Sequence, residues 1–137
     1  MKTFIVIWFG QFVSMLGSRL SDFGLGIWIF QKTGNAASFA MSAVCTVLPA
    51  LLFAPFAGSL ADRKKRKAII LLTDSIDAGL KILIVTILIL NKLELWMIYP
   101  LLFISGTVGT FQNPAFSASI PMLVPADKLT QANGLLQ

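Results

Sequence analysis

Five charged residues stand inside stretches that are otherwise almost wholly apolar, and their types could bind ions or move protons. They are Arg19, Asp22, Asp74, Asp77 and Lys81. The chain has no histidine, so any proton carrier among its side chains would have to be a carboxylate. A charge near the centre of a membrane costs at least about 2.5–3.5 kcal/mol, so it persists only where it is paired, hydrated or needed.

These charges form two groups, each on one helix face. Arg19 and Asp22 are three residues apart, within reach of each other. They either neutralise each other near the outer mouth or line a cavity and contact a substrate. Asp77 and Lys81 stand in the favourable acid-before-base order and lie deep enough to require protein or water around them. Asp74 is either an ordinary interfacial or packing acid, or a functional one. Any of the three aspartates is therefore a candidate to carry a coupling proton.

Other reactive groups are scarce. Cys45 is the one cysteine and lies in an apolar run, so the sequence predicts neither a disulfide framework nor a thiolate metal site. Nothing resembles a glycine-rich phosphate-binding loop, so ATP-driven pumping has no support. We expect no cofactor, no bound metal and no catalytic residue, and hence no enzyme.

Long helices must hold the charged side chains. The chain has 137 residues, of which 56% are hydrophobic and 12% charged, about half the charged fraction of a soluble domain. Residues 33–61 and 95–126 carry no charge, and both stretches exceed the roughly 20 helical residues that cross a bilayer. The sequence predicts an all-α integral membrane protein. Its spans are expected at about 4–30, 38–60, 68–90 and 95–118, with a fifth helix starting near 129.

A strongly basic loop fixes the expected orientation. Residues 62–67 hold one Asp and five Lys/Arg, whereas the turns at Lys32 and Lys92 hold one basic residue each. Loops rich in Lys and Arg stay in the cytoplasm, so the N-terminus is predicted to be cytoplasmic. Trp28 and Trp96 then fall at the outer interface, as an aromatic belt requires. Most of the net charge of +5 sits in this loop, which favours contact with lipid headgroups and argues against nucleic acid as a partner.

Several residues predict how the helices pack. A run of small side chains in the fourth span favours close helix contact: Ser105, Gly106, Thr107, Gly109 and Thr110. Gln112 and Asn113 follow and are expected at the cytoplasmic interface. Pro49 and Pro55 predict kinks in the second span. Further prolines place the end of the fourth span between residues 113 and 121.

The basic loop resembles the signature of the major facilitator superfamily, in which Gly-x-Leu-Ala-Asp-Arg-x-Gly-Arg-Lys joins the second and third helices. The corresponding residues here are Gly58, Asp62, Arg63, Arg66 and Lys67. Residues 10–18, 32–34 and 114–134 are also similar to the macrolide-efflux-like branch of that superfamily. Together these segments extend the resemblance over essentially the whole chain.

The resemblance implies a twelve-helix transporter in two six-helix halves that works by alternating access. This chain would supply helices 1 to 4 and the start of helix 5, with the remainder of the same transporter as its partner. The family's loop forms a cytoplasmic latch against the opposite half, a role that would pass to Asp62, Arg63 and Arg66. The chain departs from the pattern at Lys65, where the family has Gly, and at Ser105, where many antiporters have Arg.

These observations predict a multi-pass transporter of the inner (plasma) membrane that exports a small solute or drug, coupled to protons or another ion. The solute would bind near the midplane, between the first and fourth spans, beside Arg19 and Asp22. One alternative is a small stand-alone membrane protein that scaffolds a partner, or a truncated fragment without function. An integral membrane enzyme has the least support, because no catalytic constellation is present.

Overall fold

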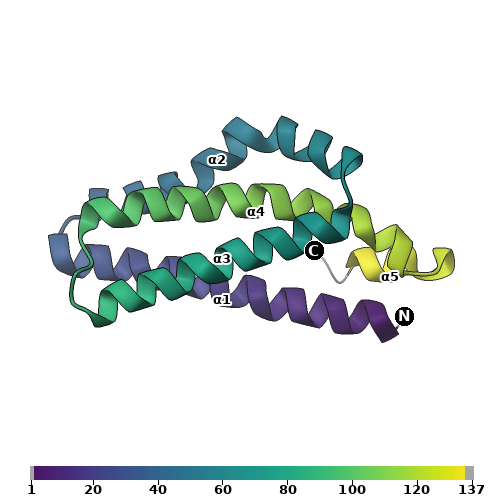
Figure 1. Ribbon diagram of the computed structural model, residues 1–137, viewed down its shortest axis with the longest axis horizontal. Coiled ribbons are helices and arrows are strands. Elements are labelled where there is room, and N and C mark those ends of the chain that lie inside the picture. Colours follow the sequence, from purple (N-terminus) through teal and green to yellow (C-terminus); the bar gives the residue numbers. More distant parts are fainter. Residues whose placement is uncertain (1, 135–137) are drawn as a thin grey trace.

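The computed structural model describes residues 2–134, which are helical apart from short turns. The elements are α1 (Lys2–Thr33), α2 (Ala36–Arg63), α3 (Arg66–Ile89), α4 (Leu95–Leu123), a 3-10 turn (Ala126–Lys128) and α5 (Leu129–Gly134). The four long helices run along the long axis of the molecule, and α5 lies at the same end as the N-terminus (Figure 1). This arrangement is the all-α membrane fold that the sequence predicts.

The fourth helix is longer than the prolines in its sequence suggested. We expected an end between residues 113 and 121, but α4 continues to Leu123 and contains both Pro114 and Pro121. Prolines persist inside membrane helices where neighbouring groups support the local backbone. Arg66 at the start of α3 also donates a hydrogen bond from Nη1 to the carbonyl oxygen of Ala118, at 2.5 Å, which ties the last turns of α4 to α3.

Short turns reverse the chain between the long helices. Gly34 ends α1 with φ of +62°, a left-handed conformation that glycine adopts without a side-chain clash, and its N–H bonds to the Phe30 carbonyl at 2.7 Å. Asn35 then caps α2 by accepting the Ala37 N–H at 2.9 Å. Asn91 is also left-handed, with φ of +54°, between α3 and α4. These turns bring consecutive helices back antiparallel.

The interior alternates between apolar and polar zones along the helix axes. At one end, a cluster centred on Leu25, Ile29, Ile84 and Leu102 joins α1, α3 and α4. At the other end, Phe4 of α1 packs with the end of α4 and with α5, and Ala61, Ile69 and Ala115 form a separate small cluster. Between these clusters lie Arg19 and Asp22 of α1 and Asp74, Asp77 and Lys81 of α3.

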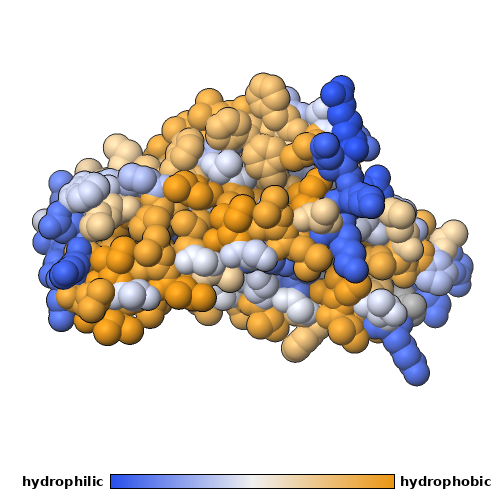
Figure 2. All heavy atoms as spheres, viewed as in Figure 1, coloured by the Kyte–Doolittle hydropathy of each residue, from blue (hydrophilic) through white to orange (hydrophobic). Residues whose placement is uncertain are grey.

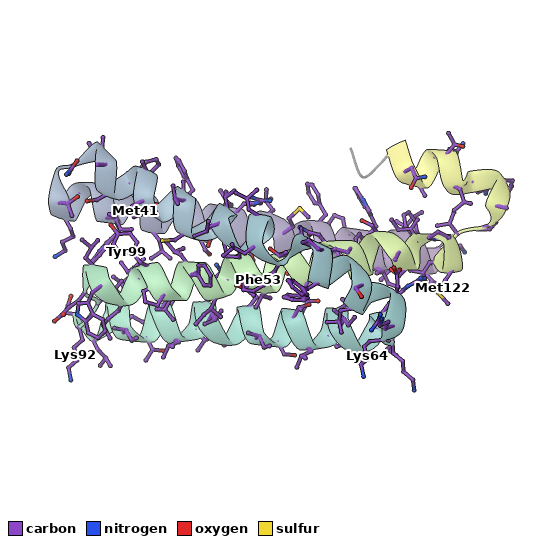
Figure 3. All side chains as sticks on the ribbon, turned by 90° about the horizontal axis from the view of Figure 1, so that it is seen from above. Met41, Phe53, Lys64, Lys92, Tyr99 and Met122 are labelled. Carbon is purple, nitrogen blue, oxygen red and sulfur yellow. The ribbon has the colours of Figure 1, made fainter. Side chains whose placement is uncertain are left out.

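Close backbone contact between α2 and α4 depends on one glycine. A Cβ atom added to Gly106 would lie 2.2 Å from the carbonyl oxygen of Thr46, a backbone atom that cannot move aside easily. The same face carries Phe53, whose ring centroid lies 6.5 Å from that of Phe103 and 6.3 Å from that of Phe111 (Figure 3). The small-residue prediction for this helix therefore holds at Gly106.

The molecular surface suits a membrane. Helices α1, α2 and α4 are each long and apolar enough to cross one. Strongly hydrophilic residues gather at the two ends of the molecule, with a largely hydrophobic face between them (Figure 2). Lys92 and Lys64 lie at these opposite ends (Figure 3). Helix α3 is not among the helices that are apolar enough, by composition alone, to cross a membrane. Its Asp74, Asp77 and Lys81 bond to α1 and α4, as described next.

Candidate functional site

Side chains from three helices form two sets of polar contacts between the apolar ends, together called the polar layer. Its members are Gln11, Ser18 and Asp22 on α1, Asp74, Asp77 and Lys81 on α3, and Ser105 and Gln112 on α4. No buried side-chain nitrogen or oxygen in residues 2–134 lacks a hydrogen-bond partner. The layer therefore satisfies the requirement that polar groups inside a membrane protein be paired.

Lys81 is the cation of the polar layer and is shared by two carboxylates. Its Nζ atom lies 2.7 Å from Oδ1 of Asp22 and 3.9 Å from Oδ1 of Asp77. It also donates to the Ser105 hydroxyl at 3.3 Å. All three charged side chains are less than one-fifth exposed, so water screens these attractions only partly.

Asp77 is held by hydroxyls from both neighbouring helices. Ser18 of α1 donates to Oδ2 at 2.6 Å, and Ser105 of α4 donates to Oδ1 at 2.9 Å. This carboxylate thus links α1 to α4 through α3. The sequence marked Ser105 as a packing residue, and the structure gives it a hydrogen-bonding role.

Asp74 is surrounded by amides. Gln11 of α1 donates to Oδ2 at 2.9 Å, and Gln112 of α4 donates to Oδ1 at 2.5 Å. Gln112 also donates to the Gln11 carbonyl oxygen at 3.0 Å, which closes a triangle of three side chains. Gln112 was expected at the cytoplasmic interface. In the structure its side chain bonds to Asp74 of α3 and Gln11 of α1, and α4 continues beyond it to Leu123.

A cavity of about 310 Å³ lies beside the polar layer, bounded mainly by α1 and α4. Its polar lining includes Gln11, Arg19, Asp22, Asp77 and Gln112, and its apolar lining includes the aromatic side chains Trp8, Phe12 and Phe116. Such a mixture suits an amphipathic small molecule, because aromatic walls supply contact area and a few polar groups fix orientation.

Comparison with known proteins places this arrangement in a family. A family model described as transmembrane secretion effector, one of those for major facilitator proteins, matches residues 1–136. The chain belongs to the major facilitator superfamily. It is therefore a multi-pass membrane protein of a transporter family.

Named relatives place the chain near the macrolide-efflux branch of the superfamily. It is 34% identical over 134 residues to Macrolide efflux protein A of Streptococcus pyogenes, covering 98% of this chain and 33% of the relative. It is 35% identical over 104 residues to Macrolide efflux protein A of Enterococcus faecalis, covering 76% of this chain and 32% of the relative. An uncharacterized major-facilitator-type transporter of Bacillus subtilis, YkuC, is 23% identical over 137 residues, covering 99% of this chain and 31% of the relative. The chain thus spans about a third of the length of these relatives. No solved structure matches it significantly.

The two residues predicted to pair within α1 are engaged differently. Asp22 bonds to Lys81 of α3, whereas Arg19 makes no ion pair or hydrogen bond within residues 2–134. Arg19 instead is exposed and lines the cavity. Of the two interpretations left open by the sequence, the placement of Arg19 fits a cavity-lining cation better than a self-neutralised pair.

The predicted gate loop lies at the end of the molecule opposite Lys92 (Figure 3). Asp62, Arg63 and Lys67 are exposed, and Gly58 has open space around its Cα atom. Arg66 is half-buried because it bonds to α4, at the Ala118 carbonyl oxygen and, at 3.2 Å, the Met122 sulfur. The major facilitator loop thus has one arginine engaged within this bundle and another left exposed.

Two further small residues of α4 line the cavity. Gly109 and Thr110 border it, and a Cβ atom added to Gly109 would meet no atom within 4 Å. The described residues contain no cluster of His, Cys, Asp or Glu able to hold a metal ion. The polar layer is therefore a site of ion pairs and hydrogen bonds beside an amphipathic cavity.

Proposed function

We propose that this chain supplies four helices and the start of a fifth to a secondary-active transporter that exports a small solute by alternating access. The observation that carries the proposal is the cavity between α1 and α4, lined by an arginine that has no ion-pair partner within the described residues and backed by paired charges. Charged side chains inside a membrane bundle are costly and mark substrate or ion pathways. The remainder of the transporter, in the length that its relatives have, would close the cavity from the other side.

Arg19 is the proposed polar contact for the solute. Its guanidinium is always charged and presents several N–H donors in a fixed plane, which suits carbonyl, hydroxyl or carboxylate oxygens. The nearby rings of Phe12 and Phe116 would pack against the apolar part of the same molecule. The curated relatives from Streptococcus and Enterococcus are named for macrolide efflux, so macrolides are the first solutes to assay.

Ion coupling is proposed to use the carboxylates of the polar layer. Asp22 and Asp77 share Lys81, so protonation of Asp22 would weaken an ion pair that joins α1 to α3, and protonation of Asp77 would weaken one within α3. Protonation would thus change the contacts between helices that must move during alternating access. This supports a proton-coupled exporter over one that binds solute without coupling.

The transporter is proposed to lie in the plasma (inner) membrane. Its N-terminus and the basic loop would face the cytoplasm. The five Lys/Arg of residues 63–67 support it, because positive loops remain on the cytoplasmic side. Asp62 and Arg63 are exposed at this end, where they could meet the opposite half when the cytoplasmic side closes. We assign the latch chiefly to these two residues, since Arg66 is already bonded to α4.

The test is solute export by the complete transporter that contains these residues. Cells or inside-out membrane vesicles are loaded with labelled macrolide, and transport is measured with the wild-type protein, with Arg19→Gln, and without the protein. We expect export to require the protein, to collapse when an ionophore removes the proton gradient, and to fall at least tenfold in Arg19→Gln. Equal retention of macrolides and other amphipathic solutes with and without the protein would overturn the export function.

A further inference from the structure

The aspartates of the polar layer are not equivalent. Asp22 and Asp77 share an ammonium group, whereas Asp74 makes no ion pair within residues 2–134. The groups facing Asp74 are the neutral amides of Gln11 from α1 and Gln112 from α4. On its own helix the nearest charged residue is Asp77, three positions on, and α2 has no charged residue before Asp62.

The charges of this zone do not balance. The polar layer and Arg19 together carry three carboxylates and two cations, so one negative charge is left over. Lys81 serves both Asp22 and Asp77, and Arg19 lines the cavity, so Asp74 has no cation beside it within the described residues. An uncompensated charge inside a membrane protein is removed most directly by a proton.

The two amides around Asp74 can change their hydrogen bonds when Asp74 gains a proton. Gln112 uses Nε2 to donate to both Asp74 and the Gln11 carbonyl oxygen, and its own carbonyl oxygen has no hydrogen bond within the described residues. When Asp74 gains a proton, its new O–H needs an acceptor in place of a donor. A turn of the Gln112 amide would supply that acceptor, and it would release the bond between Gln112 and Gln11.

From this geometry we infer that Asp74 is the proton-carrying group of the transporter, and that Gln11 and Gln112 form a clasp that holds α1 to α4 when Asp74 is ionised. A proton from water bonds to a carboxylate oxygen of Asp74 and later returns to water on the other side. No other covalent bond changes. The inference rests on the proposed transport function and narrows its coupling site from three aspartates to one.

The position of the clasp explains how a proton could affect solute. Gln11 and Gln112 both line the cavity, whereas Asp74 does not. The amides therefore stand between the proton site and the solute site. Solute that displaces or reorients either amide changes the groups around Asp74, and a proton on Asp74 changes the amides that solute meets. Such mutual influence is what coupling between two sites requires.

The first test measures transport by the complete transporter in lipid vesicles, with and without an imposed pH gradient. Asp74→Asn preserves the shape of the side chain but cannot take a proton. We expect it to abolish the acceleration by the gradient, so that transport with the gradient equals transport at equal pH, whatever the absolute rate of exchange. Asp74→Glu should restore part of the acceleration. Asp22→Asn and Asp77→Asn should lower exchange, because both break contacts of the polar layer, yet keep the ratio of gradient-driven to equal-pH transport.

A second measurement does not depend on transport. Infrared spectra of the protein in lipid vesicles detect the C=O stretch of a protonated carboxyl group as the pH is lowered. We expect a band from the membrane interior that is absent in Asp74→Asn and present in Asp77→Asn. Persistence of that band in Asp74→Asn, or its absence from the wild-type protein, would overturn the inference.

The two measurements separate the possible failures. If the wild-type transporter responds to the pH gradient and Asp74→Asn responds equally, Asp74 is not the proton site and the proposed export function stands. If the wild-type protein moves solute without any response to the gradient, the coupling role of Asp74 is overturned together with proton coupling itself.

Discussion

The ammonium group of Lys81 on α3 lies 2.7 Å from the carboxylate of Asp22 on α1, so an ion pair joins two different helices in the middle of the bundle. The same ammonium lies 3.9 Å from Asp77. Because Asp22 faces Lys81, its neighbour Arg19 has no ion-pair partner within residues 2–134 and lines the cavity. One contact thus determines which charge is structural and which is available to a solute.

Removing the shared cation should destabilise the bundle strongly. Lys81→Met leaves Asp22 and Asp77 with no cation, and breaking a buried ion pair by removing one partner costs roughly 3–5 kcal/mol. Since the partners are nearly one-fifth exposed, we expect the lower end of that range. Unfolding of the purified protein in detergent measures the loss.

Two further variants test whether the effect arises from charge imbalance. Lys92→Met changes an exposed lysine in the turn before α4 and should leave the unfolding free energy nearly unchanged. Adding Asp22→Asn to Lys81→Met should recover part of the lost stability. Equal destabilisation by Lys81→Met and Lys92→Met would contradict the structural role of the ion pair.

Gly106 should be the least replaceable glycine of α4. In Gly106→Ala the new Cβ would lie 2.2 Å from the Thr46 carbonyl oxygen, so α2 and α4 must separate. Overpacking of this kind costs about 1–3 kcal/mol. Gly109→Ala is the matched control on the same helix, because its Cβ meets nothing within 4 Å. Melting temperatures in detergent should fall for Gly106→Ala only, and equal values for both would show that the helices do not approach so closely.

The sequence predicts which charged residues lie within the long helices, but it does not predict which residues on other helices they contact. Composition and the lengths of the uncharged stretches are sufficient to predict long apolar helices. The basic loop is specific enough to predict the superfamily. The contact between Asp77 and Lys81 follows from helical spacing alone. Asp22 was instead expected beside Arg19, since spacing along one helix says nothing about which way that helix is rotated against its neighbours.

Gln11 and Gln112 were not predicted as members of the site. Neutral amides cost little at a membrane interface, so nothing in the sequence marks Gln112 as interior, and Gln11 was noted only within a motif resemblance. Their roles emerge only when α1, α3 and α4 are packed together.

Arg63 and Arg66 should contribute differently to the free energy of unfolding. Arg66→Gln loses the bond to the Ala118 carbonyl oxygen, and a hydrogen bond from a charged group contributes about 1.5–3 kcal/mol when buried. Because Arg66 is only half-buried, we expect a loss of about 1 kcal/mol. Arg63→Gln changes an exposed side chain and should leave the unfolding free energy unchanged. A larger loss for Arg63→Gln than for Arg66→Gln would reverse our assignment.

Asp62 should matter for transport and not for insertion. In the complete transporter, Asp62→Asn removes a carboxylate proposed to close the cytoplasmic side, while all five Lys/Arg that set orientation remain. We expect export to fall several-fold with an unchanged amount of protein in the membrane, measured by transport and immunoblot together. Normal export by this variant would remove the latch role.

The most direct test of the central claim, that solute occupies the cavity between α1 and α4, is to fill that cavity. Gly109 lines it, and a Cβ atom added there would meet no atom within 4 Å, so we expect the side chain of Gly109→Leu to extend into the solute space. Gly79→Leu is the matched control, because Gly79 on α3 also has open space around it and does not line this cavity.

Export of labelled solute by the complete transporter is then compared between the two variants at equal amounts of membrane protein. The cavity account predicts that Gly109→Leu loses at least nine-tenths of export, on the order of the loss expected when a single buried contact is replaced by a clash, while Gly79→Leu exports normally. Undiminished export by Gly109→Leu would contradict the account, because solute could not then pass through this space.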